Sequence, residues 1–182
     1  KVVCKGYYDD GTYNLKVNFK EASNWETESN NNVNLADKIS LDKWYHGALS
    51  SSTDVDFYKF TVSESGYSTI SLKHTNLADS NTYYYVYLYD SSFTQLTVFS
   101  STGFEESRAL EKYGLTKGTY YLKVTALDTK NLAANYSNEP YAVKVSHKAV
   151  SNWETENNNR FNLADKVKLG TPISGITTDG DT

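Results

Sequence analysis

The chain contains almost the same sixteen-residue sequence twice. "SNWETESNNNVNLADK" begins at Ser23 and "SNWETENNNRFNLADK" begins at Ser151, and thirteen of the sixteen positions are identical. Trp25 and Trp153 are 128 residues apart. One repeat is therefore as long as a whole domain and much longer than the unit of a solenoid.

The sequences that precede the two copies keep the same register. "TYNLKVNFK" leads into the first copy and "PYAVKVSHK" leads into the second. We therefore expect residues 1–20 to carry the C-terminal strands of a preceding repeat, residues 21–148 to form one complete repeat, and residues 149–182 to begin a following one. On this interpretation the chain is a window on a tandem array.

Within the complete repeat, apolar and polar residues alternate with a period of two. In "DFYKFTV" the alternation turns Tyr58, Phe60 and Val62 to one face, and "YSTISLKH", "KGTYYLKV" and "PYAVKVSHK" follow the same rule. Short strands separated by Gly, Asn and Ser turns predict an all-β fold, an antiparallel jelly-roll β-sandwich. "NLADKI" and "EESRALEKY" are the two candidates for short helices.

Composition excludes several classes of protein. The formal net charge of −4 disfavours a nucleic-acid-binding surface, and no apolar run is long enough to span a membrane. One cysteine rules out an internal disulfide, and the sequence holds no HExxH, GxSxG or phosphate-loop motif. We expect a non-enzymatic protein, since these catalytic motifs are missing. The absence of methionine and near absence of cysteine favour a bacterial secreted or cell-surface module.

The repeated segment carries closely spaced oxygen donors. Glu26, Glu28 and Asn30 are separated by two residues each, so an extended backbone points them the same way. Calcium takes six to eight oxygen ligands, which makes it the expected cofactor. The alternative is a solvated acidic linker that was copied by duplication. The expected calcium ligands are Glu26, Glu28, Asn30, Asn31, Asp54 and Asp56 in the first copy, and Glu154, Glu156, Asn158, Asn159, Asp179 and Asp181 in the second.

The order of these features resembles the bacterial pre-peptidase C-terminal domain family, which includes the collagen-binding domains of clostridial collagenases. The resemblance rests on "ETESNNNVNLADKI", "DVDFYKFTV", "SGYSTISL", "VYLYD", "GTYYLKV" and "YAVKVS" in that order. It implies a non-catalytic jelly-roll module in which an E-x-E-x-N-(N/D) segment and later aspartates bind calcium. This chain has Asn31 where a carboxylate can stand.

The strand "TYYYVYLYD" offers a second candidate site. If Tyr84, Val86 and Leu88 face the core, the other tyrosines form a row on the outer face of the sheet. Such a row suits glycan or extended peptide, and the alternative is that cross-strand tyrosines only stabilise the sheet. The candidate ligand-binding residues are Tyr83, Tyr85, Tyr87 and Tyr89.

Three functions remain open from the sequence. The first is a calcium-stabilised structural stalk, fibre or spacer, whose partners are neighbouring repeats or head-to-tail copies. The second is an adhesive module that binds collagen, another matrix protein or a glycan. The third is an accessory domain beside a secreted peptidase.

Overall fold

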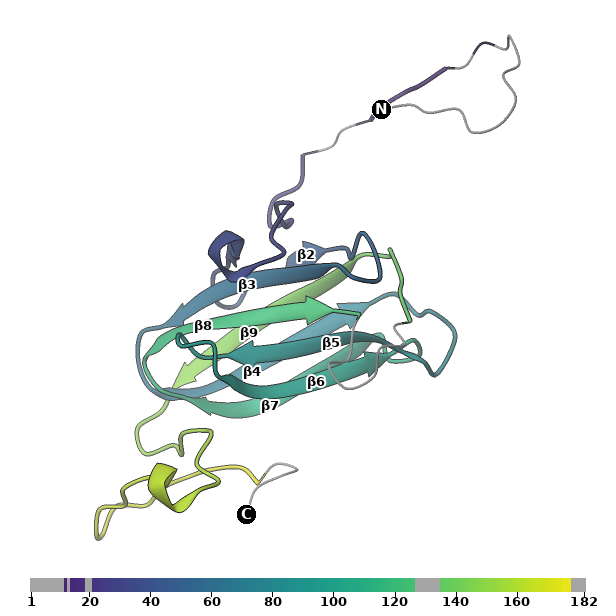
Figure 1. Cartoon of the computed structure of the whole chain (residues 1–182). Helices are drawn as coiled ribbons and strands as arrows, with labels where there is room; N and C mark the ends of the chain where they lie inside the picture. The colour runs from purple at the N-terminus through teal and green to yellow at the C-terminus, as the bar shows by residue number, and fades with distance from the viewer. Residues whose placement is uncertain (1–11, 13, 19–20, 127–134, 178–182) are drawn as a thin grey trace.

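In the strands Val55–Val62 and Gly66–His74 every second side chain is buried, so each of these strands has one face for the core and one for the surface. The computed structural model describes residues 12, 14–18, 21–126 and 135–177, and these form two facing β-sheets (Figure 1). The strands are β1 Asp37–Lys38, β2 Tyr45–Gly47, β3 Val55–Val62, β4 Gly66–His74, β5 Thr82–Tyr89, β6 Gln95–Thr102, β7 Ser107–Leu115, β8 Gly118–Thr125 and β9 Tyr141–Ala149.

The sheets have five and four strands. The larger has the order β1-β3-β8-β5-β6 and the smaller the order β2-β9-β4-β7. All pairings are antiparallel except that of the two-residue β1 with β3. The predicted all-β sandwich is confirmed.

The core lies between the two sheets. Tyr58, Phe60 and Val62 of β3 are buried, as their alternation predicts. They meet buried residues from both sheets, among them Ile70, Leu72, Tyr84, Val86, Leu88, Leu122, Val124, Val143 and Val145.

One of the two helix candidates is wrong. "EESRALEKY" contributes most of strand β7, which pairs along its length with β4. Its Glu, Ala, Leu and Lys residues favour helices in isolation, but the strand ends in Tyr113 and Leu115, which are buried in the core. "NLADKI" begins inside a single 3-10 turn, η1 at Val33–Leu35, and continues into β1. The counterpart of this turn in the second copy, η2, spans Phe161–Leu163.

Residues 14–18, expected to belong to a strand, form none, and Leu15 and Val17 are exposed. The part of the chain that the structure describes offers these residues no strand to pair with, which a preceding repeat would supply.

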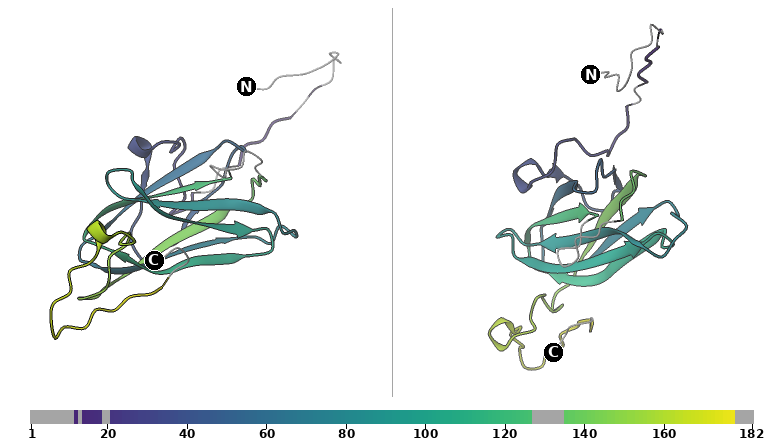
Figure 2. Two further views of the ribbon diagram at one scale, coloured as in Figure 1. Left: turned by 60° about the horizontal axis from the view of Figure 1, so that its bottom comes forward. Right: turned by 45° about the vertical axis from the view of Figure 1, so that its right-hand side comes forward.

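The two copies of the repeated segment lie on opposite sides of the sandwich (Figures 1 and 2). The first runs beside β2 and β3, and the second follows β9 away from the other end. No helix in the described part of the chain is long and apolar enough to cross a membrane.

Candidate metal centre

The first copy of the repeated segment is fastened to the edge of the smaller sheet. Trp25 forms a parallel β-bridge with His46, in which the Glu26 N–H donates to the His46 carbonyl at 2.9 Å. On the other side of the bridge, the His46 N–H donates to the Asn24 carbonyl at 2.8 Å. The extended backbone therefore turns the Glu26 side chain towards β2 and the core.

Glu26 reaches the interior over Gly47. One of its carboxylate oxygens accepts from the Ala48 N–H at 2.6 Å, and the other accepts from the Tyr58 hydroxyl at 2.9 Å. A Cβ on Gly47 would stand 2.5 Å from the Glu26 carboxylate, from the Tyr58 hydroxyl and from the Tyr141 hydroxyl. The absence of a side chain at Gly47 makes the room that the carboxylate occupies.

Asp56 brings a second carboxylate to the same place from β3. Tyr58 follows it by two residues on the same face, and Tyr141 of β9 joins them from the other sheet. The Tyr141 hydroxyl donates to Asp56 Oδ2 at 2.5 Å and lies 2.8 Å from the Tyr58 hydroxyl. These two tyrosine hydroxyls lie on the core side of the two carboxylates and hydrogen-bond to them.

Two buried oxygens of the site have no hydrogen-bond partner. They are Asp56 Oδ1 and Asn30 Oδ1, both on fully buried residues. Asn30 is held next to β3, because its backbone carbonyl accepts from the Phe57 N–H at 3.1 Å. An unpaired buried oxygen is costly, so both atoms fit a ligand that accepts electron pairs.

Three carboxylates converge here. Glu26, Glu28 and Asp56 each place one oxygen within 4.8 Å of the others, and they are the one group of three or more such residues among the residues described. In the described part of the chain the one salt bridge joins Arg108 to Glu105. No lysine or arginine therefore forms an ion pair with the three carboxylates of the site.

Crowding and burial disturb the acid–base behaviour of all three groups. Burial raises the pKa of Asp56 well above its usual value, and the charge of Glu26 raises it further. Burial also raises the pKa of Glu26, although the Ala48 and Tyr58 hydrogen bonds oppose it. For Glu28, burial and then the charge of Asp54 raise the pKa. A divalent cation among these oxygens would remove the repulsion, and an oxygen-only donor set suits a hard ion such as calcium.

The remaining predicted ligands of the first copy lie elsewhere. Asp54 is buried, but its two oxygens accept from the backbone N–H groups of Ser50 and Val55 at 2.6 and 2.9 Å. It therefore holds the turn before β3 and acts on the site through its charge. Asn31 is exposed. The structure thus brings together Glu26, Glu28, Asn30 and Asp56.

The second copy repeats the local geometry of the first. The Glu154 N–H donates to the Ser174 carbonyl, and the Glu154 carboxylate accepts from the Ile176 N–H. Glu26 makes the same two hydrogen bonds with His46 and Ala48. Asn158 donates to Asp165 at 3.2 Å, the distance at which Asn30 donates to Asp37. Both copies also have a cis peptide bond after their second glutamate.

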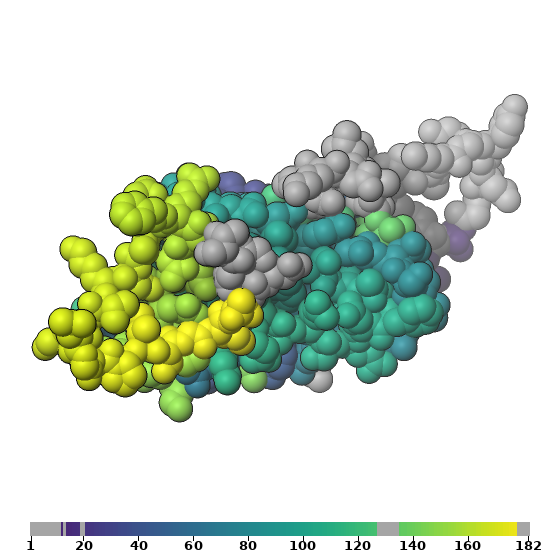
Figure 3. Space-filling model, turned by 90° about the horizontal axis from the view of Figure 1, so that it is seen from below, coloured from purple at the N-terminus to yellow at the C-terminus, as the bar shows by residue number. Residues whose placement is uncertain are grey.

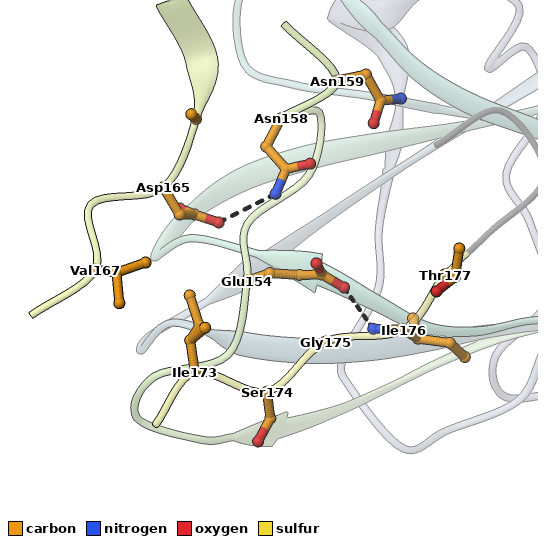
Figure 4. Close-up of a pocket in the computed structure, with 11 residues that line it drawn as sticks. Glu154, Asn158, Asn159, Asp165, Val167, Ile173, Ser174, Gly175, Ile176 and Thr177 are labelled. Carbon is orange, nitrogen blue, oxygen red and sulfur yellow. Dashed lines mark hydrogen bonds between the residues drawn. The ribbon is translucent and has the colours of Figure 1, made fainter. Parts of the chain in front are cut away.

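The second copy lies beside an open hollow rather than a closed site. Glu154, Asn158, Asn159 and Asp165 line it together with Gly175 (Figure 4). No equivalent of β3 covers them in the described part of the chain. The predicted ligands Asp179 and Asp181 lie outside the described residues, and Glu156 is not in the lining.

The sequence interpretation missed two kinds of residue. Asp37 accepts from the Thr27 N–H at 2.8 Å and from Asn30, and Asp165 does the same in the second copy. The sequence could have indicated these two aspartates, since both lie in the repeated "NLADK". Tyr58 and Tyr141 carry no such signal, because only the pairing of the two sheets brings their hydroxyls to the carboxylates.

The predicted row of tyrosines forms in part. Tyr85, Tyr87 and Tyr89 follow one another with ring centroids 6.4 and 6.3 Å apart. Phe93 extends the row at 5.6 Å from Tyr89. Tyr87 is only 2% exposed, with the Lys123 ammonium 5.1 Å from the centre of its ring.

Tyr83 lies outside the row. A register shift between Thr82 and Tyr84 interrupts the β5–β6 pairing. The Tyr83 ring packs against the core, and its hydroxyl donates to Asp79 at 2.8 Å.

Comparisons with known proteins give only distant likenesses. No protein-family model matches the chain, and no curated protein matches it. Among solved structures, it is similar to the pre-peptidase C-terminal domain of a collagenase from Bacillus anthracis, with 19% identity over 61% of this chain and 94% of that one, at a TM-score of 0.45. Two structures of Streptococcus pneumoniae fucose-binding modules share 12% and 13% identity over 59% and 56% of this chain and 73% and 75% of theirs, at TM-scores of 0.32 and 0.29. At these TM-scores the likenesses do not bear on ligand or activity.

Proposed function

We propose that the chain is a non-catalytic, calcium-stabilised repeat module of a secreted or cell-surface protein, and that it acts as a structural stalk, fibre or spacer. One observation carries the proposal: the convergence of Glu26, Glu28 and Asp56 next to the unpartnered buried oxygens of Asn30 and Asp56. Oxygen ligands from a linker segment and from β3 would let one ion fasten the segment to the sandwich.

The chemistry of the proposed ion supports the proposed compartment. Extracellular calcium sites work at dissociation constants of about 10⁻⁴ to 10⁻³ M, where calcium is abundant. A site assembled from three carboxylates and one amide, partly open through the exposed Glu28, suits that range. Calcium would then be a standing part of the folded module rather than a signal.

The test is the unfolding of the full chain in calcium and in chelator. At a calcium concentration of 100 times the dissociation constant, binding adds about 2.7 kcal/mol to the free energy of unfolding. The Glu26→Gln/Glu28→Gln variant should lose this gain, because it removes two of the three negative charges that attract the ion, and neutral amide oxygens bind calcium more weakly than carboxylates. The matched variant Glu154→Gln/Glu156→Gln alters the same residues of the second copy and should keep it.

Two results would contradict the proposal. One is a native chain that unfolds identically in calcium and in chelator. The other is an equal calcium gain in the chain that lacks the two first-copy carboxylates, which would move the ion to another part of the molecule.

A second function, adhesion to collagen, another matrix protein or a glycan, is favoured by the row of Tyr85, Tyr87, Tyr89 and Phe93. Contiguous aromatic rings on a sheet face suit sugar rings and extended peptides. Because Tyr87 is buried, the test uses Tyr85→Ser/Tyr89→Ser, with Tyr136→Ser outside the row as its control. Binding to immobilised triple-helical peptide or to an oligosaccharide array should fall about tenfold or more only in the first variant. A native chain that binds neither surface would exclude adhesion to these two kinds of ligand.

A further inference from the structure

The second tryptophan of the repeat is used to dock the segment that carries it. The Trp153 ring packs against the Tyr67 ring of β4, with centroids 4.7 Å apart. Just before it, the Val150 N–H donates to the Ser65 carbonyl at 3.2 Å. Seen from below, the C-terminal segment covers part of this end of the sandwich (Figure 3). The start of the second copy is thus attached to the complete repeat.

The surface beneath this segment is shaped for close backbone contact. Tyr67 of β4 and Gly114 of β7 are directly paired. A Cβ on Gly114 would collide with the Glu154 carbonyl, and the Gly114 carbonyl accepts from the Glu156 N–H at 3.2 Å. We call Tyr67 and Gly114 the acceptor surface, because these two paired residues contact the Trp153 segment directly.

The first tryptophan has the same local structure but no such surface under it. Asn24 and Asn152 have φ angles of 60° and 63°, and the bridges Trp25–His46 and Trp153–Ser174 correspond. Trp25 stacks on His46 with centroids 5.6 Å apart, yet 43% of it is exposed. A large aromatic side chain is left open at the position where its counterpart is docked.

We propose that the Trp25 segment is an unfilled docking element whose partner is the acceptor surface of another copy of this repeat. The inference rests on the proposed function, because it supplies the contact through which such modules would join. Within the chain, the Trp153 segment occupies the acceptor surface and so displays the geometry of the contact. Among the residues that the structure describes, no second acceptor lies under Trp25, so the one that fits it comes from another copy of the repeat.

Trp153 and Glu154 are adjacent in sequence but contact different parts of the chain, the complete repeat before them and the segment after them. In the second copy, the Trp153 side chain points back to Tyr67, while the Glu154 carboxylate points forward to the Ile176 N–H (Figure 4). The intervening backbone lies on Gly114. Docking on one repeat therefore fixes the position of the carboxylates that the following repeat would use.

The experiment weakens the attachment of the Trp153 segment to the acceptor surface in the full chain and offers that surface a second copy. Trp153→Ala removes the ring that covers Tyr67, and the variant is immobilised and titrated with native chain. We expect association at least about tenfold tighter than that of native chain on immobilised native chain, where the acceptor is filled. Trp25→Ala in the titrated chain should abolish it, as should a further Gly114→Val or Tyr67→Ala change in the immobilised one.

Both acceptor variants are included because valine at Gly114 can disturb β7, whereas Tyr67 is partly exposed at the surface. Association that persists with Trp25→Ala, or its absence from the Trp153→Ala chain at every soluble concentration, would overturn the proposal. No acceptor residue is a proposed calcium ligand. A failure here would therefore leave the calcium-dependent gain in stability untouched, and a failure of that gain would leave the association measurable.

Discussion

Gly47 and Gly118 are both glycines of strands, but a methyl group at each would meet different neighbours. At Gly47 it would stand 2.5 Å from the Glu26 carboxylate and from two tyrosine hydroxyls, all in the site. At Gly118 the nearest atom is 3.6 Å away, on the Tyr120 ring, which is an ordinary contact. Only the first glycine is tied to the candidate metal centre.

We predict that Gly47→Ala lowers the free energy of unfolding by about 1–3 kcal/mol, as overpacking of a filled site does. It should also reduce the gain from calcium, because Glu26 must move. Gly118→Ala should leave stability unchanged or raise it by up to about 1 kcal/mol, since alanine restricts the unfolded chain. Urea unfolding of both variants in calcium and in chelator measures this. If the two changes had equal effects on stability and on the gain from calcium, Gly47 would have no special role in the site.

At the scale of the elements, the alternation of residues predicted which face of each strand is buried. Tyr58, Ile70, Val86 and Leu122 all lie in the core, as a period of two requires. Alternation reports only one residue's environment at a time, so it gave no sign of the register shift that removes Tyr83 from the row. The intrinsic helix preference of "EESRALEKY" likewise did not predict a strand, because the segment becomes one through its pairing with β4.

The candidate site was predictable to the extent that it is local in sequence. Glu26, Glu28 and Asn30 share one short segment, and Asp56 is one of the two aspartates expected as ligands just before the "FYKFTV" strand. Asp54 looks equivalent to Asp56 by spacing, but each of its oxygens accepts a backbone N–H of its own turn, a local role that spacing does not reveal. The part played by Tyr141 could not be read from the sequence, because its contact with Asp56 joins the two sheets across 85 residues.

At the scale of the whole molecule, the buried carboxylates set how stability changes with pH. The pKa values of Glu26, Glu28 and Asp56 are raised in the folded chain above ordinary values near 4. At pH values between the ordinary pKa values of the unfolded chain and the raised pKa values of the folded chain, the folded state therefore binds more protons than the unfolded state. Stability from these groups is full below about pH 4 and is lost as the pH rises through the raised values.

We therefore predict that the free energy of unfolding in chelator falls between pH 5 and pH 8, by up to about 1.4 kcal/mol per pH unit for each proton difference. Glu105, whose pKa is lowered by its hydrogen bond from the Thr102 N–H, stays ionised in both states over this range. Urea unfolding at several pH values tests the slope, and Asp56→Asn should flatten it. Calcium should bind more tightly as the pH rises, since protons must leave first. A stability that rises with pH in chelator would show that the site is not strained by its charges.

The docking of the Trp153 segment on Gly114 has a geometric consequence. A fixed rotation and translation from one unit to the next is a screw operation, so units joined by identical junctions wind into a helix. The pitch and hand of that helix would be properties of a single contact between the β4–β7 edge and the Trp153 segment. A small angular error there would add up along the array, and one substitution at the acceptor surface could change the shape of an entire fibre without unfolding any of its parts.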